Sequence, residues 1–88
     1  MINHLKELRK RVDDIDVQLV ELLEKRLNIT KEMIDFKKQN NIQLEDKHRE
    51  FQITEHLAAI VSEENKTVLS KETINQIWKN VFEMTKHG

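Results

Sequence analysis

The stretch LKELRKRVDDIDVQLVELLEKRLNITKEMIDF, residues 5–36, decides the fold of this chain. Ten of its positions recur at an unbroken spacing of three and four residues, and nine of the ten are apolar. That spacing places all ten on one face of a long amphipathic helix. We call this face the seam; its members are Leu5, Leu8, Val12, Ile15, Leu19, Leu22, Arg26, Ile29, Met33 and Phe36.

The charged member of the seam, Arg26, raises the question of function. Burying an arginine is costly unless an anionic group meets it. Glu50 is one candidate, as a structural counter-ion, and a bound anionic ligand is another. A lone arginine at such a position can also set helix register or extend to solvent.

Composition narrows the class of protein. The 88 residues suit one domain, which we place over residues 1–88. The chain has no cysteine, no proline and one glycine, which argues against disulfides, thiolate metal sites and phosphate-binding loops. The net charge of −1 argues against nucleic acid as a partner. Without a membrane-length apolar run or a signal-peptide pattern, a cytoplasmic protein that does not enter the membrane is expected.

The remaining pattern predicts an all-α fold of three helices. The first spans about residues 4 to 39, the second begins after Asp46 as N-cap, and the third begins after Ser70 as N-cap. Residues 62–67 are predicted to form the loop between the last two helices. These two helices, about 25 Å each, are too short to cover a first helix of roughly 50 Å. We therefore predict an intertwined homodimer, with a plain coiled-coil dimer as the alternative.

Several cations share one side of the first helix. Arg9, Arg26 and Lys37 project in nearly the same direction, and Arg26 and Lys37 are three turns apart, or roughly 16 Å. Their side chains can converge on one small anion. Arg9 is about 25 Å from Arg26 and can approach that residue only across an antiparallel dimer. Arg49 and Glu50 begin the second helix; taken singly, they and Lys37 are typical of solvated surface.

The combination of these residues carries a resemblance to a known family. From about residue 5 to its end, the chain resembles the all-helical AroQ-type chorismate mutases. The shared pattern is distributed but specific, and the spacing from Arg9 to Glu50 fits without a gap. It comprises Leu8-Arg9, Ile15-Asp16, Leu22-Leu23 with Arg26, Lys37, and Asp46-x-x-Arg49-Glu50.

The resemblance implies an intertwined dimer that converts chorismate to prephenate without a metal or cofactor. Arg26 and Arg9 of the partner subunit would hold the two carboxylates of chorismate, and Lys37 would bind the ether oxygen. Glu50 would accept a hydrogen bond from the ring hydroxyl, assisted by backbone near Asp46. The remaining two implied contacts are Arg49, which would add positive field, and Thr85, which matches a family serine near a carboxylate.

One departure from the family pattern implies weaker activity. The family usually has glutamine or glutamate eleven residues after the aromatic that Trp78 matches, which would be position 89, beyond Gly88. Loss of one such donor costs about 10²–10³ in rate. The alternatives are an isochorismate pyruvate-lyase, a 4-amino-4-deoxychorismate mutase, or a non-catalytic helical regulatory or binding module of a shikimate-pathway enzyme.

Overall fold

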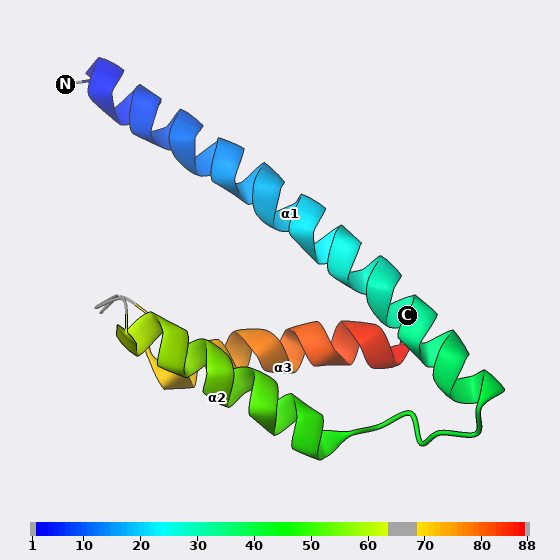
Figure 1. Ribbon diagram of the computed structural model, residues 1–88. Coiled ribbons are helices and arrows are strands. Elements are labelled where there is room, and N and C mark those ends of the chain that lie inside the picture. Colours follow the sequence, from blue (N-terminus) through cyan, green and yellow to red (C-terminus); the bar gives the residue numbers. More distant parts are fainter. Residues whose placement is uncertain (1, 64–68, 88) are drawn as a thin grey trace.

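The computed structural model describes residues 2–63 and 69–87 and contains three helices in that part of the chain. They are α1 (Ile2–Gln39), α2 (Lys47–Glu63) and α3 (Lys71–His87). The prediction of an all-α fold with one long N-terminal helix is confirmed (Figure 1). Helix α1 begins two residues earlier than predicted, and α2 continues into the predicted loop as far as Glu63. The rest of that predicted loop, residues 64–67, lies outside the described residues.

Both predicted N-caps are confirmed. The backbone N–H of Arg49 donates to Asp46 Oδ1 at 2.9 Å, and that of Thr73 donates to Ser70 Oγ at 3.1 Å. Each cap satisfies a backbone donor that has no partner within its helix and typically contributes about 1 kcal/mol. These caps define where α2 and α3 begin, and so which side chains occupy their first turns.

Helix α1 ends in a Schellman motif. Asn41 adopts a left-handed conformation with φ 56°. The N–H of Ile42 donates to the carbonyl of Lys37 at 2.8 Å, and that of Asn41 donates to the carbonyl of Lys38 at 3.4 Å. This turn reverses the chain, so that the segment before α2 runs back past the last turn of α1.

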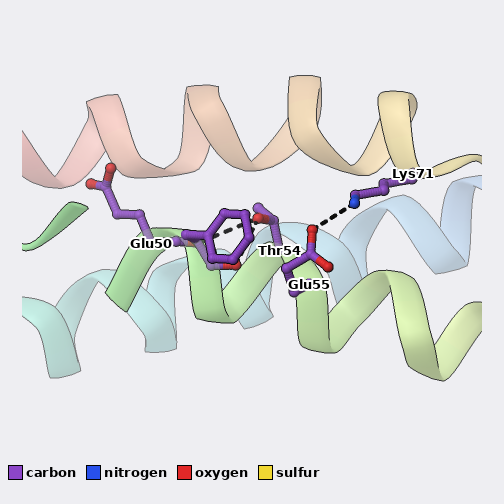
Figure 2. Close-up of polar contacts among 5 residues, drawn as sticks. Glu50, Thr54, Glu55 and Lys71 are labelled. Carbon is purple, nitrogen blue, oxygen red and sulfur yellow. Dashed lines mark hydrogen bonds and ion pairs between the residues drawn. The ribbon is translucent and has the colours of Figure 1, made fainter. Parts of the chain in front are cut away.

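Helix α3 joins the other two helices. It packs against both α1 and α2, whereas α1 and α2 have no backbone contact with each other in the described residues. The end of α3 lies beside the last third of α1, and the first half of α1 extends away from the other helices (Figure 1). Among the side chains that the structure describes, the two buried apolar ones, Ile74 and Val81, belong to α3. An ion pair of 2.6 Å between Lys71 and Glu55 also joins α3 to α2 (Figure 2).

The seam remains uncovered in a single chain. Its apolar members are all exposed, from 38% for Leu8 to 60% for Leu22, and α1 contains no buried residue. The chain exposes 7842 Å², against roughly 5,500 Å² for a compact monomer of its mass. Its radius of gyration is 16.8 Å, against about 12 Å for a compact domain of this length. The prediction that the two short helices leave much of the seam bare is confirmed.

Candidate functional site

A pocket of about 360 Å³ lies where the three helices come together. It forms because α3 separates the end of α1 from the start of α2, leaving a space that the α1–α2 connection borders. Four parts of the chain contribute to its lining. These are Arg26, Thr30, Met33, Ile34, Lys37 and Lys38 of α1, Leu44, Glu45 and Asp46 of the connection, Arg49, Glu50 and Ile53 of α2, and Phe82 and Thr85 of α3.

The pocket brings together six of the seven residues singled out from the sequence. They are Arg26, Lys37, Asp46, Arg49, Glu50 and Thr85. The seventh, Arg9, is exposed on the first half of α1, about 25 Å along the helix from Arg26. A single chain therefore does not bring Arg9 to this pocket.

Local structure explains why the charged residues face one space. Arg26 and Lys37 are three helical turns apart and so lie on the same side of α1. The cap at Asp46 sets the start of α2, which puts Arg49 and Glu50 in its first turn. Figure 2 shows the side chain of Glu50 directed from α2 toward α3. The N-terminus of α2 adds a positive partial charge to the same region.

Arg26 is a half-buried cation without a carboxylate partner. No ion pair or hydrogen bond of its guanidinium occurs among the side chains that the structure describes. Desolvation by burial, and to a lesser extent the nearby Arg49 cation, lower the pKa of Arg26 below its ordinary value. The interpretation of Glu50 as the structural counter-ion of Arg26 is therefore wrong for this chain. Instead, the guanidinium carbon lies 5.8 Å from the centre of the Phe82 ring.

Lys37 is also half-buried, and its ammonium is oriented by backbone. Its Nζ donates to the carbonyl of Leu44 at 3.3 Å, across the turn that ends α1. An ammonium has three donors, so the others remain available to a ligand. On the opposite wall, the hydroxyl of Thr85 donates to the carbonyl of Val81 at 3.1 Å and keeps its acceptor capacity.

The charges around the pocket favour an anion. Four cations line it (Arg26, Lys37, Lys38 and Arg49), together with three carboxylates (Glu45, Asp46 and Glu50). Asp46 already accepts the capping hydrogen bond, and Glu45 lies 4.0 Å from the ammonium of Lys47. Glu50 makes no ion pair among the described side chains and can accept a hydrogen bond from a ligand. Such a site suits a small dianion that also carries a hydrogen-bond donor.

Apolar side chains complete the pocket, and sequence reasoning did not assign them to it. The sequence pattern predicts Met33 only as a member of the seam, whereas Met33 and Phe82 both line the same space as the cations. The sequence spacing could have assigned Phe82 to the pocket, because Phe82 precedes Thr85 by three residues and therefore lies on the same side of α3. The apolar wall lowers the local dielectric and strengthens the attraction between the cations and an anion.

Two further features are absent from the part of the chain that the structure describes. No group of three or more His, Cys, Asp or Glu side chains lies close enough together to hold a metal ion. Neither does any helix in the described part of the chain combine the length and apolar character that crossing a membrane requires.

Comparisons with known proteins identify the family to which the chain is similar. A family model described as "Chorismate mutase type II" matches residues 8–87. A protein of Methanocaldococcus jannaschii named "Chorismate mutase" is 32% identical over 65 residues. The match covers 74% of this chain and 66% of that relative, so the chain spans slightly less than two thirds of the relative's length. No solved structure matches the chain.

Proposed function

Because the chain belongs to the chorismate mutase type II family, we propose that it converts chorismate to prephenate. The observation that carries the proposal is the pocket itself. Arg26, Lys37 and Arg49 meet there from two helices, and Arg26 has no carboxylate partner among the described side chains. An anionic substrate would supply the missing negative charge.

The reaction requires only that protein side chains orient the substrate and stabilise its charge. It is an intramolecular rearrangement in which one C–O bond breaks and one C–C bond forms within a single dianion. No nucleophile or proton transfer is needed. The protein must hold the flexible substrate in a compact conformation and stabilise negative charge that develops on the ether oxygen. Fixed cations in a partly apolar pocket meet both requirements.

Two arginines would hold the two carboxylates of the substrate. Arg26 is suited to this because its planar guanidinium can bind a carboxylate through two parallel hydrogen bonds. The second would be Arg9 of the partner subunit, since Arg9 of the same chain is too distant. Thr85 would contribute a hydroxyl near one of these carboxylates.

Lys37 would stabilise the transition state at the ether oxygen. The hydrogen bond from its Nζ to the Leu44 carbonyl holds the ammonium at the pocket wall, and its other N–H groups can reach the substrate. Its charge counts most as the C–O bond lengthens, because negative charge then grows on that oxygen.

The start of α2 would bind the ring of the substrate. Glu50 would accept a hydrogen bond from the ring hydroxyl, assisted by backbone near Asp46. Arg49 would add positive field, as the effect of its charge on Arg26 already indicates. The acceptor role of Glu50 is equally compatible with a ring amine, so substrate identity is part of the test below.

A homodimer follows from the same proposal. The single chain exposes roughly 2,400 Å² more than a compact monomer would, and the seam of α1 makes up a continuous part of that surface. Pairing two α1 helices would bury this seam over an area typical of obligate dimers. An antiparallel arrangement would also bring Arg9 of the partner subunit toward Arg26.

The test is turnover of chorismate by the intact protein, followed as loss of chorismate absorbance with prephenate identified as the product. We expect Lys37→Ala to lower kcat/KM by about 10²–10³. The matched control is Lys31→Ala, because Lys31 is an exposed lysine of the same helix that lies outside the pocket. This control should keep wild-type turnover.

Three other outcomes would overturn the assignment. Pyruvate release from isochorismate without prephenate formation would indicate a lyase. Turnover confined to 4-amino-4-deoxychorismate would indicate a mutase of that amine. If the folded protein at high concentration does not raise the rate above that of the uncatalysed reaction, the chain is a non-catalytic binding or regulatory module.

A further inference from the structure

Arg26 is supported by an aromatic ring where an acidic side chain would be the usual partner. Its guanidinium carbon lies 5.8 Å from the centre of the Phe82 ring, within the distance at which a cation is attracted to an aromatic face. Two effects oppose this position of the guanidinium. Burial removes water from the charge, and the nearby Arg49 cation repels it; both lower the pKa of Arg26, desolvation more than Arg49. Something must therefore hold the guanidinium at the pocket against both effects.

Phe82 is well placed for that task. It is half-buried on α3, the helix that packs against both α1 and α2, and it follows directly after the buried Val81. Its ring lines the same pocket as Arg26 and Thr85. Phe82 belongs to α3 and Arg26 to α1, so the ring holds the guanidinium through a contact between the two helices.

The chemistry of the contact matters for binding. A carboxylate in the place of Phe82 would occupy the N–H donors of Arg26 and neutralise its charge before a ligand arrived. The face of a phenyl ring attracts the cation but accepts none of the in-plane N–H hydrogen bonds that a carboxylate would take. The ring therefore leaves the guanidinium charged and its donors available.

We propose that Phe82 is a positioning residue that holds the Arg26 guanidinium in the pocket and so prepares it to bind an anionic carboxylate. The contact itself is a property of the folded chain. Its kinetic consequence rests on the proposed chorismate mutase activity, so the two are tested separately.

The first test needs no substrate. In the wild-type protein, the side-chain N–H of Arg26 should show an NMR chemical shift displaced by the ring current of Phe82. Phe82→Leu keeps an apolar side chain of similar size and should remove the displacement, while Phe82→Tyr should keep it. An Arg26 resonance that is identical in wild type and Phe82→Leu would overturn the proposal, whatever the activity.

The second test is kinetic. Phe82→Leu should raise the KM for chorismate by about 3- to 30-fold, the range that a cation–aromatic contact supports, with a smaller effect on kcat. Phe82→Tyr should restore the KM to within about threefold of wild type. The matched control is Phe51→Leu, because Phe51 is an exposed phenylalanine of α2 that does not line the pocket; its KM should be unchanged.

The outcomes separate this proposal from the proposed function. Equal KM values for the leucine and tyrosine variants, or a loss of thermal stability that accounts for the whole effect, would show that Phe82 is only a packing residue. A normal ring-current displacement with no turnover in the wild-type protein would refute the mutase activity and leave the positioning contact standing.

Discussion

Replacing Arg26 by alanine should lower activity strongly while changing stability little, because Arg26 makes few contacts that stabilise the fold. The change removes the contact with Phe82, which is worth about 0.5–1 kcal/mol at a partly exposed site. It also removes the desolvation cost and the repulsion from Arg49 that together lower the pKa of Arg26. These effects oppose each other, so we expect the free energy of unfolding to change by less than about 1 kcal/mol.

The effect on catalysis should be far larger. Truncating one partner of a desolvated, hydrogen-bonded charge pair typically costs about 2–5 kcal/mol. That range corresponds to a decrease of roughly 30- to 5,000-fold in kcat/KM for chorismate. Arg26→Lys keeps the charge but loses the bidentate geometry and should give an intermediate value. Arg11→Ala, which removes an exposed arginine of α1 outside the pocket, is the matched control and should behave as wild type.

The pH dependence provides an internal check on the stability result. The pKa of Arg26 in the folded chain lies below its ordinary value, so the folded state binds this proton less tightly than the unfolded chain does. Arg26 therefore makes stability rise with pH only under strongly alkaline conditions, where the folded state begins to lose this proton before the unfolded chain does. Between about pH 6 and pH 8, Arg26 stays charged in both states, and the difference in stability between Arg26→Ala and wild type should not vary with pH.

The measurements are chemical denaturation, sedimentation velocity and chorismate turnover on the same preparations. The reasoning is refuted if Arg26→Ala dissociates or unfolds the protein in proportion to its lost activity, because Arg26 would then be structural. It is equally refuted if Arg26→Ala retains turnover within a few-fold of wild type.

Two further predictions concern the fold. Leu19→Glu places a charge at the middle of the seam, where Leu19 is 53% exposed in a single chain. Because a dimer would bury this charge, the variant should be monomeric in sedimentation velocity. An unchanged dimer would mean that the seam is not the interface. Asn41→Ala should destabilise the protein by about 1 kcal/mol in urea denaturation, because alanine disfavours the left-handed conformation at φ 56°, whereas Asn41→Gly should be neutral or stabilising. Equal midpoints for these two variants would contradict that explanation.

Much of the fold could be read from local patterns in the chain. The three helices, the end of α1 at Gln39 and the caps at Asp46 and Ser70 all depend on side chains a few residues apart. Such short-range signals act before any tertiary contact forms. The shared direction of Arg26 and Lys37 was predictable for the same reason, because both lie on one rigid helix.

The pairing of Arg26 with Phe82 and the apolar wall of the pocket depended on three-dimensional packing. Helical periodicity tells which face of α1 carries Arg26, but it does not tell which residue of another helix lies opposite that face. That partner is selected by the way α3 packs between α1 and α2. The local sequence thus specified a long helix with a cation on its apolar face. The packing of α3 placed that cation against an aromatic ring, in a pocket where no carboxylate pairs with it among the described side chains. The second feature could not be read from the sequence, because contacts between distant segments exist only once the helices have assembled.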